Sequence, residues 1–234
     1  VLNLLLLAVG AAFVLENIDT KISGREEAER IIHRPFLGTI MRVNTESREY
    51  EEKLNALSPS ERQEFASLDQ TAQVEFFPLY FKKSNVSESI RLVRTNLLFM
   101  GLDRQHTTIL ITSAHPKEGK STVVNYLGLG LTALGKRVVI VDSDLHKPML
   151  HRIHSLDNDR GLSSWMLAQL DLSQVIQPSR IEGLDVISSG PLPPNSAELL
   201  ASTRFEELIH ELEDRYDYVL FDSPPLLVLS DALV

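Results

Sequence analysis

Hydrophobic and polar residues follow one another in regular blocks through the second half of the chain. Short runs rich in β-branched residues predict strands, and longer runs with apolar residues three or four positions apart predict helices. The predicted strands are 107–113, 137–142, 183–188 and 216–222, and the predicted helices are 87–100, 121–135 and 195–215, the last with Asn195 as its candidate N-cap. Strands that alternate with helices indicate an α/β fold, with a parallel sheet and helices on both faces. Ligands of such sheets bind beyond the carboxyl ends of the strands.

Residues 1–15 form an apolar run in which Asn3 is the sole polar side chain. As a helix, this run would be about 22 Å long, shorter than the ~30 Å hydrocarbon core of a bilayer. A signal-peptide core, a buried helix and the C-terminal part of a transmembrane helix are three interpretations, and we favour the last. Basic residues follow at Lys21, Arg25, Arg30 and Arg34. By the positive-inside rule, the chain after about residue 16 would lie in the cytoplasm.

Two polar segments separate this run from the α/β region, which we place at 84–234. Residues 16–43 balance acidic and basic side chains and are predicted as a juxtamembrane segment. Residues 44–83 are predicted as a polar linker with short helices. One of these helices would begin with Ser58 as its N-cap, and Glu61 would complete a capping box.

Composition narrows the functional classes. The chain has 234 residues, with 23 Lys and Arg against 32 Asp and Glu, and a formal net charge of −9. An acidic chain without a basic block is a poor candidate for non-specific nucleic-acid binding, which requires clustered Lys and Arg. The sequence contains no cysteine, which excludes disulfides, cysteine zinc sites and thiol nucleophiles.

The first predicted strand of the α/β region runs directly into a candidate phosphate-binding loop. Ala114, Gly119, Lys120 and Ser121 follow the Walker A pattern, with Ala in place of the opening Gly. Backbone N–H groups of such a loop surround phosphate oxygens, and the following helix adds the positive end of its dipole. Lys120 can reach the β- and γ-phosphates, and the Ser121 hydroxyl can bind Mg²⁺. The complete candidate loop is Ala114, His115, Pro116, Lys117, Glu118, Gly119, Lys120, Ser121 and Thr122.

Carboxylates follow two other predicted strands. Asp142 and Asp144 come at the end of the second strand, and Asp222 ends the fourth, where an apolar strand followed by Asp is typical of a Walker B motif. Carboxylates beside a triphosphate can hold Mg²⁺ or accept a proton. Without the P-loop, an ordinary acidic turn would explain Asp142 and Asp144. With it, we predict that the three carboxylates meet at one nucleotide.

Glu88, Arg91 and Arg94 recur at three-residue steps on one face of the helix predicted at 87–100. This pattern fits an exposed ion pair within the helix, worth about 0.3–0.5 kcal/mol, or a subunit interface. The charge pattern alone favours the ion pair.

Taken together, these motifs resemble the bacterial tyrosine kinases of capsular and exopolysaccharide synthesis, which belong to the deviant P-loop class. The resemblance rests on the P-loop, on VDSDLHKP at 141–148, on FDSPP at 221–225, on GPLPPNSAELLAS at 190–202 and on the E-x-x-R-x-x-R helix. The segments LENIDTKI and RPFLGTI, which follow the apolar run, are similar to the exit from the second transmembrane helix of a chain-length-determinant module.

The resemblance implies a P-loop NTPase-like fold and an ATP- and Mg²⁺-dependent tyrosine autokinase. Lys120, Asp142 and Asp144 would be catalytic, with Asp142 as the base that accepts the tyrosine proton and Asp144 assisting the metal site. Ser121, Asp142 and Asp222 would bind Mg²⁺.

The resemblance also implies partners and a location. Glu88, Arg91 and Arg94 would pack against the nucleotide site of a neighbouring copy in a ring, which replaces the ion-pair interpretation. The neighbour's tyrosines would be the acceptors, and the polysaccharide polymerisation and export machinery would be the wider partner. The location would be the bacterial inner (cytoplasmic) membrane.

The chain departs from the family pattern at several positions. Lys117 stands where Gly is common, His146 replaces the commoner Arg, and Ser196 replaces the last Pro of a PPNP segment. His115 stands where partition-type ATPases carry a signature Lys. The family's tyrosine-rich tail and last strands would lie beyond Val234.

Two other functions compete with the kinase. A partition- or septum-type ATPase switch would hydrolyse ATP to control dimerisation, although His115 and the E-x-x-R-x-x-R helix argue against it. A nucleotide-binding scaffold without turnover is the other alternative, and the extra cation at Lys117 motivates it.

Overall fold

A computed structural model describes residues 24–100 and 108–226 of the chain. The apolar run at 1–15 and its predicted membrane helix lie outside these described residues. The chain divides into two compact units, Val1–Gly38 and Thr39–Val234. The described part of the first unit contains α2 (Arg25–Ile32), which ends at His33 with a left-handed φ of 54°. Within the described ranges, no helix has the length and apolar character needed to cross a membrane.

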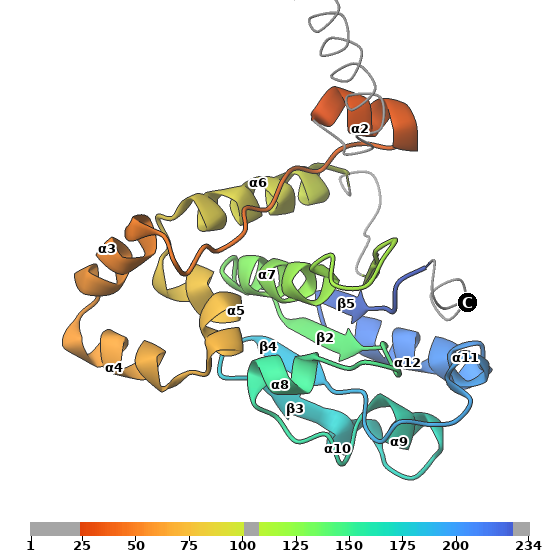
Figure 1. The fold of residues 1–234 in the computed structure, drawn as a ribbon. Coiled ribbons are helices and arrows are strands. Elements are labelled where there is room, and N and C mark those ends of the chain that lie inside the picture. The colour runs from red at the N-terminus through yellow and green to blue at the C-terminus, as the bar shows by residue number, and fades with distance from the viewer. Residues whose placement is uncertain (1–23, 101–107, 227–234) are drawn as a thin grey trace, which may run out of the picture. The chain divides into compact units, whose positions relative to one another are not determined.

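The second unit is built on a five-stranded sheet in the order β1-β5-β2-β4-β3 (Figure 1). The strands are β1 (Thr108–Ile111), β2 (Val138–Asp142), β3 (Ile176–Pro178), β4 (Leu184–Ile187) and β5 (Tyr218–Asp222). β1, β5, β2 and β4 run parallel, which confirms the predicted parallel α/β fold. β3 pairs antiparallel with β4 at the edge. β3 was not predicted, because three residues that end in Pro show no strand pattern.

Helices cover both faces of the sheet, as predicted (Figure 1). α7 (Lys120–Thr132) lies on one face, and α9 (Leu162–Met166), α10 (Leu172–Val175) and α12 (Thr203–Glu213) lie on the other. The remaining helices of this unit are α3 (Arg48–Ala56), α4 (Pro59–Ser67), α5 (Gln70–Tyr80), α6 (Asn85–Met100), α8 (Leu150–His154) and α11 (Ser196–Leu200).

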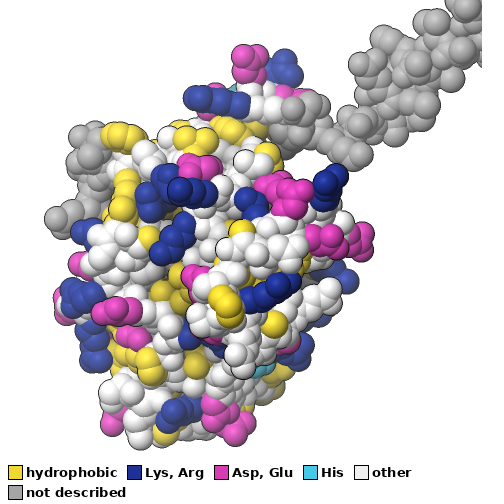
Figure 2. Space-filling view, turned by 90° about the vertical axis from the view of Figure 1, so that its left-hand side faces the viewer, with side chains coloured by type: hydrophobic (Ala, Val, Ile, Leu, Met, Phe, Trp, Pro, Cys, Tyr) yellow, Lys and Arg dark blue, Asp and Glu magenta, His cyan; other side chains and the backbone are white. Residues whose placement is uncertain are grey.

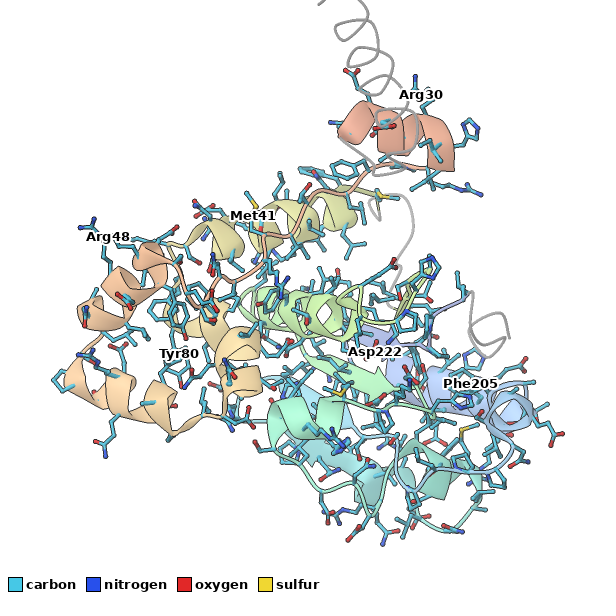
Figure 3. All side chains as sticks on the ribbon, in the orientation of Figure 1. Arg30, Met41, Arg48, Tyr80, Phe205 and Asp222 are labelled. Atoms are coloured by element: carbon cyan, nitrogen blue, oxygen red, sulfur yellow. The ribbon has the colours of Figure 1, made fainter. Side chains whose placement is uncertain are left out.

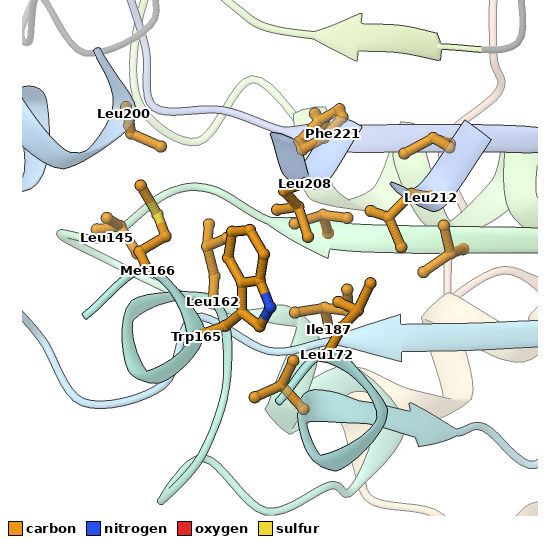
Figure 4. Packing of buried hydrophobic residues seen from close by; sticks show 14 residues of the cluster. Leu145, Leu162, Trp165, Met166, Leu172, Ile187, Leu200, Leu208, Leu212 and Phe221 are labelled. Atoms are coloured by element: carbon orange, nitrogen blue, oxygen red, sulfur yellow. The ribbon is translucent and has the colours of Figure 1, made fainter. Parts of the chain in front are cut away.

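Alternation along the strands decides which side chains face α7. Val139, Val141 and Phe221 belong to the buried apolar cluster on the α9–α12 side, which also contains Trp165. Figure 4 shows Phe221 and Trp165 within this cluster. Ile140 points the other way and packs against α7, where a Cβ at Gly128 would come within 2.8 Å of Ile140 Cδ1. Because side chains alternate with a period of two, Asp142 and Asp222 belong to the α7 face. The two faces therefore separate an apolar core from the carboxylates.

The segment 44–83, predicted as a linker with short helices, carries α3, α4 and α5. The capping box at Ser58 and Glu61 is confirmed. Aromatic residues of this segment are buried, and Tyr80 lies among the side chains between α4 and α5 (Figure 3). The outer face of these helices mixes acidic and basic side chains, including the Arg48–Glu52 pair at 3.0 Å (Figure 2).

The helix predicted at 195–215 is two helices in the structure. α11 ends at Leu200, and Ser202 takes an extended conformation before α12 begins at Thr203. The Ser202 hydroxyl donates to the Leu199 carbonyl at 2.6 Å, so it competes with the helical backbone. Asn195 is the N-cap residue of α11, as predicted, but its side chain accepts no backbone N–H. Its amide donates instead to the Glu198 carboxylate at 3.1 Å.

Gly161 precedes α9 and packs against the backbone of the residues that follow β4, so a substitution there tests this packing. A Cβ at position 161 would overlap the Ser188 carbonyl oxygen and the Gly190 amide nitrogen, both of them backbone atoms. We expect Gly161→Ala to lower the free energy of unfolding by about 2–3 kcal/mol, measured by urea denaturation. Gln169→Ala, at an exposed position nearby, should change it by less than about 0.5 kcal/mol. Equal stabilities of the two variants would contradict the close packing.

Candidate functional site

The candidate P-loop connects β1 to the N-terminus of α7. Gly119 is the residue before α7 and has a φ of 90°, a conformation that glycine adopts without steric cost. Lys117 has a φ of 67°, in the left-handed region where a side chain costs about 1–2 kcal/mol. The loop therefore has a glycine-type backbone conformation at Lys117, the position where the resembled family commonly has Gly. On its exposed side, the His115 N–H donates to the Glu118 carboxylate at 3.1 Å.

A cavity of about 480 Å³ opens beside this loop. Four parts of the unit line it: the P-loop with the start of α7, the segment from Asp144 to α8, α5, and the turn after β5. The lining residues are Thr71, Glu75, Pro116, Lys117, Gly119, Lys120, Ser121, Thr122, Asp144, His146, Lys147, Met149, Ile153 and Pro225. Of the predicted loop residues, Ala114, His115 and Glu118 are exposed and do not line the cavity.

Lys120 and Asp144 form an ion pair in the cavity wall. The Lys120 ammonium lies 3.1 Å from Asp144 Oδ2, and the two side chains are only 12% and 4% exposed. Asp144 Oδ1 accepts the backbone N–H of Lys147 at 2.9 Å and that of His146 at 3.3 Å. The backbone therefore holds the carboxylate that positions the P-loop amine, and this pair brings together two of the predicted catalytic residues.

Asp142 and Asp222 are register partners at the ends of the neighbouring parallel strands β2 and β5. Both are almost fully buried, and Asp222 lies at the end of β5 that faces the loop before α7 (Figure 3). Asp142 Oδ2 accepts the N–H groups of Met149 and Leu150, both at 3.0 Å, and so caps the start of α8. Asp142 Oδ1 and both carboxylate oxygens of Asp222 accept no hydrogen bond.

Burial and like charge shift the titration of both groups. Burial, followed by the neighbouring Asp222, raises the pKa of Asp142 to about 8, against the lowering effect of its two backbone hydrogen bonds. Burial also raises the pKa of Asp222 to about 6. The Ser121 hydroxyl and the Lys120 ammonium lie near enough to lower the pKa of Asp222, although that hydroxyl makes no full hydrogen bond. A cation between the two strand ends would relieve this repulsion.

These residues fit a magnesium–nucleotide complex. Mg²⁺ is usually held by one or two carboxylates together with substrate phosphates and water. The unpartnered oxygens of Asp142 and Asp222, together with the Ser121 hydroxyl that lies near Asp222, could supply the protein ligands. Within residues 24–100 and 108–226, no group of three or more His, Cys, Asp or Glu forms a metal site by itself. Two carboxylates beside a phosphate-binding loop suit a cation that arrives with phosphate.

The three charged residues of α6 lie in different environments. The Arg91 guanidinium donates to both carboxylate oxygens of Glu88, at 2.9 and 3.0 Å, and both side chains are about half exposed. Arg94 instead donates to the Gly130 carbonyl of α7 at 2.8 Å. The ion pair within the helix is therefore present, and Arg94 ties α6 to the P-loop helix.

Some residues at the cavity were not singled out from the sequence. Thr71 and Glu75 reach it from α5, and the only sequence signal for Glu75 is one acidic residue within the apolar run VEFFPLY. His146 and Ser196, two departures from the family pattern, lie 2.9 Å apart through Nε2 and Oγ. The two substitutions therefore share one contact, which single positions in a sequence cannot reveal.

The raised pKa of Asp142 predicts a pH-dependent stability. A folded-state pKa of about 8 exceeds the unfolded value of 3.8, so the native state binds this proton more tightly and loses stability as the pH rises from about 5 to 8. Asp142→Asn removes this titration while its amide oxygen can still cap α8. We expect the variant to gain roughly 1–3 kcal/mol over the wild type between these pH values, in urea unfolding with EDTA and no nucleotide. Parallel pH profiles for the two proteins would contradict the buried titration.

Comparisons with known proteins agree with this geometry. Residues 106–233 match the AAA domain family. The chain is 45% identical over 152 residues to the tyrosine-protein kinase YwqD of Bacillus subtilis, covering 65% of this chain and 64% of YwqD. It is 36% identical over 160 residues to CapB of Staphylococcus aureus, whose name gives it as a candidate tyrosine-protein kinase, covering 67% of this chain and 70% of CapB.

A solved structure supports the same relationship. The kinase domain of the Escherichia coli tyrosine kinase ETK superposes with a TM-score of 0.74 at 28% identity, covering 91% of this chain and 77% of that domain. The chain spans less than two thirds of YwqD and 23% of the full-length tyrosine-protein kinase etk. Its identity to CapB over most of CapB's length, together with the AAA-domain match, shows that the chain belongs to the family of bacterial tyrosine kinases.

Proposed function

We propose that this chain transfers the γ-phosphoryl group of ATP to tyrosine hydroxyls. The observation that carries the proposal is the meeting of the Lys120 ammonium with Asp144 at the cavity, beside the paired strand ends of Asp142 and Asp222. The relatives named as tyrosine kinases supply the acceptor class. Phosphoryl transfer depends mostly on positioning and charge stabilisation, which is what a rigid set of buried charges provides.

Each residue has a role that its position supports. The Lys120 ammonium would leave Asp144 for the phosphates, while the N-terminus of α7 and the loop N–H groups bind phosphate oxygens. Ser121, Asp142 and Asp222 would hold Mg²⁺, which neutralises charge that develops on the phosphates, and Asp144 would assist that site. Asp142 would accept the tyrosine proton, because a pKa raised toward neutral suits a general base.

The tyrosines that the structure describes are poorly placed to accept a phosphoryl group. All 5 tyrosines of the sequence lie in the described residues, and none has an exposed side chain. The Tyr126 hydroxyl donates to the Val74 carbonyl at 2.8 Å, and the Tyr216 hydroxyl donates to Asp185 at 2.7 Å. Phosphorylation of either hydroxyl would first require these contacts to break.

A neighbouring copy would contact α6 through Glu88 and Arg91, with Arg94 fixing the orientation of the helix on α7. Exposed apolar side chains on the same helix support this, with Leu92 55% and Phe99 65% exposed. Such a contact would build a ring in which each copy places its α6 against the nucleotide site of the next.

The wider role would be control of capsular or exopolysaccharide polymerisation and export at the bacterial inner membrane. The apolar run at 1–15 and the basic residues after it support a membrane anchor with the kinase in the cytoplasm.

The activity is tested with the chain, Mg²⁺, labelled ATP and a Glu–Tyr copolymer as acceptor. We expect phosphotyrosine in the copolymer, and at least an approximately 100-fold loss of rate for Lys120→Met, because a preorganised charge on the transferred group is lost. Lys136→Met, at an exposed position away from the cavity, is the matched control and should keep the wild-type rate. Thermal melting of each variant checks folding.

Other outcomes assign the chain differently. Phosphate release without phosphotyrosine would favour an ATPase switch. ATP binding without any turnover would favour a scaffold.

A further inference from the structure

Glu75 of α5 is an acidic side chain in the wall of the proposed nucleotide cavity. It is only 6% exposed and lines the cavity together with Lys120, Ser121 and Thr122. It lies outside residues 106–233, which match the AAA domain. A carboxylate at a phosphate-binding loop repels the negative charge of a phosphate ligand, so the presence of Glu75 at this position needs an explanation.

The contacts of Glu75 are with the first turns of the P-loop helix. The Thr122 hydroxyl donates to Glu75 Oε1 at 2.5 Å, and the Asn125 amide donates to the Glu75 backbone carbonyl at 2.8 Å and to its Oε2 at 3.3 Å. The neighbouring Tyr126 hydroxyl donates to the Val74 carbonyl. α5 is therefore fastened to the helix whose N-terminus would receive the phosphates.

The Thr122 hydroxyl has one proton to donate, and Glu75 accepts it. Thr122 lies in the first turn of α7, where a phosphate group would otherwise receive that hydrogen bond. A phosphate in the cavity would also face the Glu75 charge in a partly dehydrated site, where like charges repel more strongly than in water. Burial, the largest effect, raises the pKa of Glu75, as expected for a charge that lacks a cationic partner.

We propose that Glu75 is an affinity-determining residue that occupies the Thr122 hydroxyl and opposes the phosphates of the nucleotide, so that binding must displace it. This inference rests on the proposed nucleotide site. If Glu75 has this role, α5, which precedes the P-loop in the sequence, is the element that responds when a nucleotide binds. Glu75 acts through Thr122 and through its charge, and it takes no part in the chemistry.

The variant that tests this keeps the contact with Thr122. In Glu75→Gln, the amide oxygen can still accept from the Thr122 hydroxyl. The charge is lost, together with the 3.3 Å hydrogen bond that the Asn125 amide donates to Glu75 Oε2, because an amide nitrogen cannot accept it. Thermal melting of the variant checks that the fold is kept.

The probes are Mg·ADP and inorganic tripolyphosphate, with dissociation constants measured by calorimetry on the full chain. We expect Glu75→Gln to bind both about tenfold more tightly, because the opposed charge acts on phosphate and not on the nucleoside. Glu52→Gln removes an exposed charge from α3 and should leave both dissociation constants unchanged.

Unchanged or weaker binding of both probes by Glu75→Gln would overturn the proposal and leave the kinase proposal standing. Tighter binding of ADP alone would also overturn it, because the effect would then act on the nucleoside. If the wild type and the variant both fail to bind either probe, the proposed nucleotide site itself is wrong.

Discussion

The structure depends on the parallel pairing of β2 with β5, which sets Asp142 directly beside Asp222. Two carboxylates at the ends of adjacent strands cannot both be ionised cheaply in a buried environment. Burial, with like charge nearby as a smaller cause, raises the pKa of both groups, and Asp142 Oδ1 and both carboxylate oxygens of Asp222 accept no hydrogen bond. The strands bear this repulsion because Val139, Val141 and Phe221 anchor the opposite face in an apolar core. Mg²⁺ bound between the two carboxylates would replace their repulsion with attraction, which would favour binding of a magnesium–nucleotide complex.

The P-loop helix joins this carboxylate pair to the rest of the unit. Its N-terminus carries Lys120 to Asp144, and its body lies against the sheet at Gly128. α6 reaches the same helix through Arg94, and α5 reaches it through Glu75. The helix that would hold the phosphates is thus also the element to which the preceding helices are attached. A change at the phosphates has a direct path to α5 and α6.

The sequence predicted the four parallel strands, the helices on both faces and the convergence of Lys120 with Asp144. These features arise from local signals: buried β-branched runs, a loop between a strand and a helix, and Asp at strand ends. The break at Ser202 escaped prediction because side-chain competition with the backbone outweighed a continuous helical pattern. Glu75 escaped prediction because its role depends on the packing of α5 against α7. The contact between His146 and Ser196 escaped because it depends on the packing of the β2–α8 loop against α11.

The central claim is that the Lys120 amine and the carboxylates of Asp142, Asp144 and Asp222 serve one magnesium-bound triphosphate. A crystal structure with Mg²⁺ and a non-hydrolysable ATP analogue tests it most directly. The account predicts Mg²⁺ at about 2.0–2.1 Å from the Ser121 hydroxyl, with Asp142 or Asp222 bound to it or to its waters. It also predicts that the Lys120 ammonium contacts the phosphates in place of Asp144. A triphosphate bound elsewhere, with Lys120 still paired to Asp144, would contradict it.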